Sequence, residues 1–131
     1  MIVVDTNIVV RFAVNDDADQ AVIAKGLFEN HTVSISRTVA LETEWVLRSR
    51  YGKARKQIAE YFGMLLAMKS VRMESESAFR KAVAWYAAGD DFADALHLAN
   101  AGAAPFYTFD GEFCKNAIAG GKAPAVVNPA K

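Results

Sequence analysis

The sequence predicts an α/β protein with a parallel sheet of about four to five strands, flanked by helices on both faces. The first observation is an uninterrupted apolar run, Ile2 to Val4, which is typical of a strand buried on both faces. The second is that helical and β-branched segments alternate along the chain, which favours right-handed crossovers between parallel strands. The third is a length of 131 residues without repeat or linker, which suits a single domain, residues 1–131.

The first half of the chain is predicted to contain two strands and four helices. Residues 15–17, Asn-Asp-Asp, break the first helix and cap the second. Polar residues alternate with Val33 and Ile35, which indicates the second strand. The predicted strands are residues 2–4 and 31–36, and the predicted helices are residues 6–14, 18–30, 38–51 and 53–68.

The second half continues the same alternation. Gly89 ends one helix, and the pair Asp90 and Asp91 opens the next. A short helix begins at Asp110 and ends at the two glycines 120 and 121. The predicted strands are residues 70–73, 105–109 and, at the edge, 125–127, and the other predicted helices are residues 74–88 and 91–101.

Composition limits the classes of function. The 15 basic and 15 acidic side chains cancel, so no global field draws the protein to nucleic acid or membrane. No apolar stretch approaches the roughly 18 residues of a membrane span. An acid at position 5 argues against a signal peptide, and the single cysteine, Cys114, fits a reducing compartment. We therefore expect a soluble, cytoplasmic protein.

Acidic residues occupy informative positions. Asp5 and Asp110 each follow a predicted strand, and the carboxyl ends of parallel strands form the edge where α/β proteins bind ligands. At roughly 100° per residue, Glu42 falls inside the apolar arc of its helix. Glu44 falls beside Arg48 and is predicted to form a solvated pair with it.

Two more acids open a single helix. Asp91 and Asp94 lie about 60° apart around the predicted helix axis, so both side chains can point toward one place. The sequence therefore offers Asp5, Glu42, Asp94 and Asp110, with Asp91 in addition, as residues that gather at one site.

Each acid also has a purely structural interpretation. Asp5 and Asp110 can be N-caps, Asp91 and Asp94 can cap their helix reciprocally, and Glu42 can lean outward along its aliphatic stem. Taken together these alternatives are less attractive, because two carboxylates ~4 Å apart at an effective dielectric of ~20 repel by about 4 kcal/mol. Such a cluster takes up protons or holds a cation.

The donor type selects the cation. A set of oxygen ligands without histidine or cysteine suits Mg²⁺ or Mn²⁺. Such an ion lowers the pKa of a bound water molecule and aligns it for in-line attack on phosphorus. Hydrolysis of a phosphodiester is therefore the chemistry that this pattern favours.

At these residues the chain resembles the PIN domain and, within it, the VapC-type toxin ribonucleases. Val4-Asp-Thr-Asn7 is similar to the family's opening motif, and Leu41-Glu-Thr-Glu-Trp-Val-Leu47 to its glutamate helix. Asp91-Phe-Ala-Asp-Ala-Leu96 is similar to its third motif and Tyr107-Thr-Phe-Asp110 to its fourth. Each motif is short, but the ordered set is fairly specific and spans essentially the whole chain.

The resemblance implies a Mg²⁺- or Mn²⁺-dependent endoribonuclease that is neutralised by a cognate antitoxin and commonly dimeric. By motif position, Asp5, Glu42, Asp94 and Asp110 would be the catalytic, metal-binding quartet. Asp91 would be a further ligand or only the helix cap. In the implied mechanism one or two metal ions activate water, which attacks RNA without a covalent enzyme intermediate. Asn7 and Thr108 would orient the carboxylates.

Two other functions fit part of the pattern. A haloacid-dehalogenase-like phosphohydrolase also uses an Asp after the first strand, but its second Asp is replaced here by Asn7. A non-catalytic RNA-binding or interaction domain would use the same fold. The five basic residues between Arg48 and Lys56 suit phosphate contacts, a solvated helix end or the acidic segment of an antitoxin.

Overall fold

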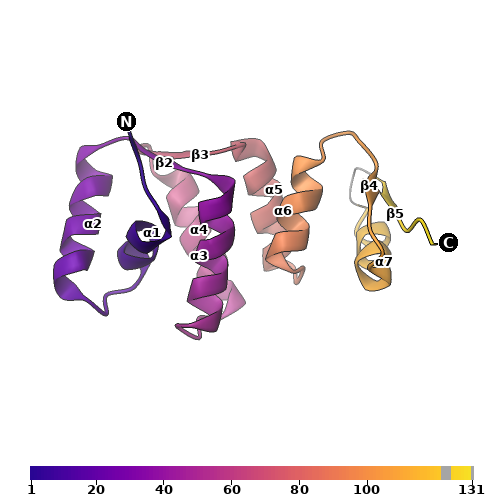
Figure 1. The fold of residues 1–131 in the computed structure, drawn as a ribbon, viewed down its shortest axis with the longest axis horizontal. Coiled ribbons are helices and arrows are strands. Elements are labelled where there is room, and N and C mark those ends of the chain that lie inside the picture. The colour runs from indigo at the N-terminus through magenta and orange to yellow at the C-terminus, as the bar shows by residue number, and fades with distance from the viewer. Residues whose placement is uncertain (122–124, 131) are drawn as a thin grey trace.

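The computed structural model describes residues 1–121 and 125–130, and its main sheet has three parallel strands (Figure 1). These strands are β1 (Ile2–Val3), β2 (Val33–Ile35) and β3 (Val71–Met73), in the order β1-β2-β3. The register pairs Ile2 with Val33 and Val33 with Val71. Strand β1 therefore forms one edge of the sheet.

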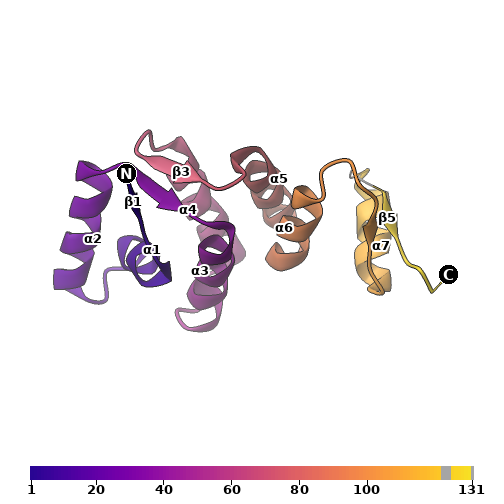
Figure 2. The same ribbon diagram turned by 45° about the horizontal axis from the view of Figure 1, so that its top comes forward.

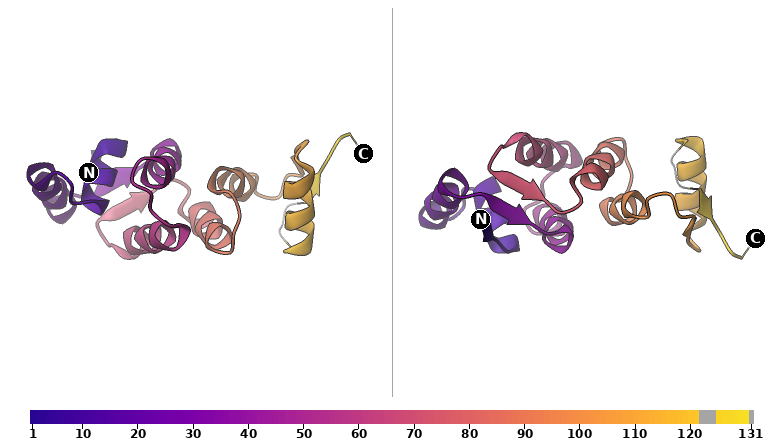
Figure 3. Two further views of the ribbon diagram at one scale, coloured as in Figure 1. Left: turned by 90° about the horizontal axis from the view of Figure 1, so that it is seen from below. Right: turned by 90° about the horizontal axis from the view of Figure 1, so that it is seen from above.

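Six helices surround this sheet. Figure 3 shows helices on both faces, with α1 and α3 on one face and α4 on the other. The predicted crossovers are thus present, since each strand of this sheet is followed by a helical segment. The helices are α1 (Thr6–Ala13), α2 (Ala18–Asn30), α3 (Arg37–Ser49), α4 (Arg55–Ala67), α5 (Glu76–Ala87) and α6 (Phe92–Asn100).

The core of this body is aromatic where α4, α5 and α6 meet. Phe62 packs against Phe79 and Phe92 with ring centroids 5.3 and 5.2 Å apart, and Tyr86 lies 5.2 Å from Phe92. All four rings are buried. Edge-to-face and offset contacts of this kind add to the free energy of burial, so the helix that carries Asp91 and Asp94 is firmly placed.

The end of the chain forms a separate C-terminal unit, which consists of β4 (Phe106–Tyr107), α7 (Gly111–Ala119) and β5 (Val126–Val127). Strands β4 and β5 pair in parallel as a second sheet. Figures 1 and 2 show this unit at one end of the long axis, beyond α5 and α6, with α2 at the other end. It contacts the body through Leu98, which forms a small cluster with Phe113 and Ala117.

The predicted α/β class with parallel strands is confirmed, and the strands and helices fall where the sequence places them. Across the described residues there are five strands, but they form two sheets and not one. The division has a local cause, because Phe106 packs on Phe113 at 5.6 Å and gives β4 a partner outside the main core. No helix among the described residues is long and apolar enough to cross a membrane.

Candidate active site

Asp5 lies at the carboxyl end of β1, where the sequence places it. Its carboxylate is exposed and caps α1 by accepting a hydrogen bond from the backbone N–H of Ile8 at 3.3 Å. The residue also lines a cleft of about 770 Å³ between β1, α1 and α2, together with Asn7 and Arg11. The N-cap interpretation is thus correct, and the cap leaves the carboxylate open to the cleft.

The residue after Asp5 connects β1 to the glutamate helix. Thr6 is buried, and its hydroxyl donates a hydrogen bond to the Glu42 carboxylate across the contact between α1 and α3. Glu42 is therefore fixed next to the end of β1 by a residue that sequence reasoning passed over. The signal was available, because a hydroxyl residue directly beside the first acid is placed to orient a neighbouring carboxylate.

The predicted environments of the two glutamates on α3 are reversed. Glu42 is exposed, whereas Glu44 is only 4% exposed. The buried face of α3 follows the spacing i, i+3, i+4, i+7 and consists of Ala40, Thr43, Glu44 and Leu47. Trp45, next to Glu44, is 48% exposed, and its ring centroid lies 5.7 Å from the guanidinium carbon of Arg50.

Glu44 tolerates burial because its carboxylate has two partners. It accepts hydrogen bonds from Arg48 at 2.8 Å and from the hydroxyl of Tyr86 at 3.0 Å. The predicted pair with Arg48 is therefore confirmed, but it is not solvated on the glutamate side. Burial and the neighbouring Glu44 raise the pKa of Tyr86. Glu44 thus joins α3 to α5 and has a structural role.

Asp91 and Asp94 begin α6. The Asp91 carboxylate accepts a hydrogen bond from the backbone N–H of Asp94 at 3.1 Å and so caps the helix. Asp91 also lines a second cleft, of about 350 Å³, and shares it with Glu42 and Trp45. The cap interpretation of Asp91 is thereby confirmed. Asp91 is also a neighbour of Glu42, because both side chains line this cleft.

The surroundings of Asp94 disturb its ionisation. Burial raises the pKa of Asp94 above its ordinary value, and the charges of Asp91 and Asp110 raise it further, while His97 lowers it. These causes show that the acids of α6 and the acid after β4 lie within electrostatic range of one another. A perturbed carboxylate of this kind is typical of functional sites and of charge networks alike.

Asp110 follows β4 and begins α7. Its carboxylate accepts a hydrogen bond from the backbone N–H of Phe113 at 3.0 Å, and its own N–H donates to the Thr108 hydroxyl at 3.1 Å. Thr108 therefore supports the backbone of Asp110 and not its carboxylate. The sequence had suggested that Asp110 and Asp5 share one sheet edge. This expectation is wrong within one copy, because β4 is not in the main sheet.

The five acids follow one another as neighbours in pairs, and they do not surround a common point. Thr6 links the end of β1 to Glu42, Glu42 shares a cleft with Asp91, and Asp91 and Asp110 act on Asp94. Within residues 1–121 and 125–130, no three of these side chains are placed to hold one metal ion. In the same ranges, none of the five forms an ion pair with a basic side chain.

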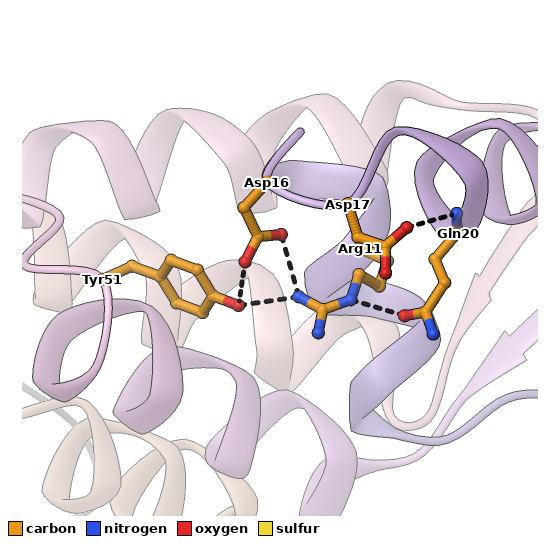
Figure 4. A network of polar contacts seen from close by, with 5 residues as sticks. All are labelled: Arg11, Asp16, Asp17, Gln20 and Tyr51. Atoms are coloured by element: carbon orange, nitrogen blue, oxygen red, sulfur yellow. Dashed lines mark hydrogen bonds and ion pairs between the residues drawn. The ribbon is translucent and has the colours of Figure 1, made fainter.

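One polar network beside the cleft was not anticipated (Figure 4). Arg11 donates to Asp16 at 2.9 Å, to the Tyr51 hydroxyl at 2.7 Å and to Gln20 at 2.7 Å, and so joins α1 to α2 and to the turn after α3. Asp17, which lies next to Asp16 between α1 and α2, caps α2 by accepting a hydrogen bond from the backbone N–H of Gln20. Arg11 and Gln20 also line the cleft that contains Asp5. The network therefore fixes one wall of that cleft.

The basic run from Arg48 to Lys56 is largely engaged in structure. Arg48 pairs with Glu44, and Arg55 donates to the backbone carbonyls of Tyr86 and Asp90 while its guanidinium lies 4.7 Å from the Tyr86 ring. These contacts give Arg48 and Arg55 a structural role, which differs from the solvated helix end, the phosphate contacts and the antitoxin contact that the sequence suggested.

A parallel α/β protein with carboxylates at the ends of its strands and at a helix N-terminus is the class that the fold and the site define. The family model described as the PIN domain matches residues 2–119, so the chain belongs to the PIN-domain family. PIN domains are generally metal-dependent nucleases, and the chain therefore has a nuclease-type fold. No curated protein and no solved structure was found to match it.

Proposed function

We propose that this protein is a Mg²⁺- or Mn²⁺-dependent endoribonuclease and the toxin of a type II toxin–antitoxin pair. The observation that carries the proposal is a succession of carboxylates in a chain of the PIN-domain family, none of which forms an ion pair with a basic side chain among the residues that the structure describes: Asp5, Glu42, Asp91, Asp94 and Asp110. Membership of the PIN-domain family supports a nuclease activity, and these acids are the residues that would bind its metal ion. The toxin role, the antitoxin and a homodimer rest on the resemblance to VapC-type proteins.

The chemistry of the donors fits a hard divalent cation, since all five side chains offer only carboxylate oxygen. Asp5, Glu42, Asp94 and Asp110 would hold the ion, with Asp91 engaged as the cap of α6. A bound Mg²⁺ or Mn²⁺ would supply a water molecule of lowered pKa for attack on the phosphodiester. The spacing of the acids within one copy does not yet bring three of them together.

The protein's own groups have separate tasks in this proposal. Thr6 holds the Glu42 carboxylate in one orientation, which lowers the cost of ordering it when RNA binds. Asp5 faces the larger cleft, whose wall carries the Arg11 guanidinium as a partner for an RNA phosphate. Localisation in the cytoplasm, where RNA and an antitoxin would both be met, belongs to the same proposal.

The direct test is cleavage of RNA by the purified protein with Mg²⁺ or Mn²⁺, compared with the Asp5→Asn variant. Asp5 is exposed, so the variant should fold and its cleavage should fall below detection. The matched control is Asp19→Asn, which removes another exposed acid, in the first turn of α2, and should cleave normally. Undiminished cleavage by Asp5→Asn would reject the assignment, and specific RNA binding without cleavage would favour a binding domain.

The toxin role needs a cellular test. Expression of the wild-type chain should arrest growth, and expression of Asp5→Asn should not. Co-expression of the gene immediately upstream, which would encode the antitoxin in this proposal, should restore growth. Growth arrest that persists in the Asp5→Asn variant would separate toxicity from nuclease activity and contradict this part of the proposal.

A further inference from the structure

Two strands of this protein present open edges of the same kind. In β1, the N–H groups of Ile2 and Val4 donate to β2-side carbonyls at 2.8 and 3.4 Å, so the backbone groups of Val3 point to the opposite side. In β4, the N–H groups of Phe106 and Thr108 donate toward β5 at 2.9 Å, so the backbone groups of Tyr107 point away from β5. Across the described residues, each of these outer edges has no neighbouring strand.

The side chains at both edges are apolar and exposed. Val3 is 76% exposed, and Ile23 of α2, which is 62% exposed, lines the cleft beside it. On the C-terminal unit, Tyr107 and Phe109 are 63% and 78% exposed. Exposed apolar surface next to an unpaired strand is a template for pairing with another strand.

The two strand edges are compatible in direction. Both small sheets are parallel, so β4 can extend the main sheet beyond β1 without reversing any strand. Tyr107 lies on the side of β4 opposite Phe106, which packs on Phe113. The bare side of β4 is therefore available for the cleft between β1 and α2.

The C-terminal unit is held in a position from which β4 does not reach β1 of the same chain. Leu98 at the end of α6 is completely buried in the cluster with Phe113 and Ala117, and Trp85 of α5 packs on that cluster. All three ribbon figures show α5 and α6 between this unit and β1. Pairing β4 with β1 of the same chain would break the Leu98 cluster, whereas pairing with another copy would keep it.

From these contacts we infer that the open edge of β1 and the cleft beside it receive the C-terminal unit of a second copy of this chain, with β4 pairing alongside β1. Two copies exchange their units reciprocally, and each gives and receives one strand. The pairing places Asp110 of one copy at the same sheet edge as Asp5 of the other. Each candidate site is then built from two chains, which accounts for the incomplete acidic group in one copy.

The docking itself does not depend on the proposed nuclease activity, and its test uses no activity. Val3→Cys and Tyr107→Cys are made in separate full-length proteins, both with Cys114→Ala, so that each chain carries one thiol. Both positions are exposed, and their backbone groups face the edges that would pair. The proteins are mixed, unfolded and refolded together, oxidised, and examined on a non-reducing gel and by light scattering.

The expected result is a dimer in solution and a disulfide-linked heterodimer that forms in the mixture and far less in either protein alone. The matched control replaces Val3→Cys by Met64→Cys, an exposed apolar position on α4, which should not link to Tyr107→Cys. A monomer in solution, or a dimer without the specific link, would overturn the inference. So would a chain with both cysteines that closes the disulfide within itself.

Discussion

The body of the protein and its C-terminal unit are built on the same plan but differ in what holds them. The body buries a continuous core that extends from β1 to α6, including the four aromatic rings of α4, α5 and α6. The unit has two-residue strands and a cluster of Phe113 and Ala117 closed by Leu98 from the body. The comparison teaches that a parallel sheet can be divided in two where one strand packs on a small local core and not on the main core.

The largest expected effect is on the body. Phe62→Ala removes a ring that contacts Phe79 and Phe92 and should lower the free energy of unfolding by about 3–5 kcal/mol. Phe113→Ala in the unit should change the free energy of unfolding of the body by less than about 0.5 kcal/mol, because it opens α7 locally. Chemical denaturation with hydrogen exchange would measure both. Equal losses of protection throughout the chain in the two variants would show that body and unit are one cooperative structure.

The next effect concerns the site and rests on both the proposed function and the exchange of units. Asp5→Asn and Asp110→Asn should each abolish RNA cleavage. After the two variants are refolded together, about a quarter of wild-type activity should return, because half of the dimers are mixed and each has one intact site. The control is each variant refolded alone. A mixture as inactive as its components, in protein shown to be dimeric, would place both acids of a site in one chain.

The two glutamates of α3 allow a sharper comparison within the body. Glu44→Ala should lower the free energy of unfolding by about 1–3 kcal/mol, because it leaves the buried Tyr86 hydroxyl without its acceptor. Glu42→Ala, on the exposed side of the same helix, takes the acceptor from the Thr6 hydroxyl but leaves no buried carboxylate site empty, so it should lower the free energy of unfolding by less, about 0.5–1.5 kcal/mol, and abolish cleavage. Thermal unfolding and RNA cleavage would be measured for both. A larger loss of stability for Glu42→Ala than for Glu44→Ala would favour the sequence prediction, in which Glu42 is buried and Glu44 is solvated.

The smallest effect is expected at Thr6, which acts through Glu42 and does not touch substrate. Thr6→Val removes the hydroxyl and keeps the shape, so cleavage should fall by roughly 10–100-fold. Thr6→Ser keeps the hydroxyl and should recover most of the activity. A role in packing alone would give the reverse order, because serine lacks the methyl group. Cleavage rates at saturating Mg²⁺, together with thermal unfolding, would distinguish these outcomes.

Much of the fold follows from local patterns in the sequence. The run from Ile2 to Val4, the alternation around Val33 and the caps at Asp17 and Asp91 fix elements through contacts among near neighbours, and the structure has them in place. The division of the sheet was not predictable in this way. It depends on whether Phe106 packs on nearby Phe113 or beside distant β1, a choice that no periodicity encodes.

The candidate site shows the same limit. Positions after strands and at helix starts identified Asp5, Asp91, Asp94 and Asp110 as carboxylates at the ends of elements, and the structure has them there. The helix angle failed at Glu42 and Glu44, because a buried face is defined by its neighbours and not by apolar residues alone. Tyr86, 42 residues further along the chain, makes Glu44 an interior residue. The role of these acids in binding a metal ion stays a prediction.

Within one copy, the outer side of β1 pairs with no strand among the described residues, and this has a consequence at high protein concentration. Its apolar surface and the one on β4 belong to different parts of the molecule, so the copy that receives a strand need not be the copy that gives one. If two molecules do not close on each other, the addition continues and produces linear polymers. Storage of the pure protein should therefore be limited by slow fibre growth, and a lysine in place of Val3 should extend its shelf life.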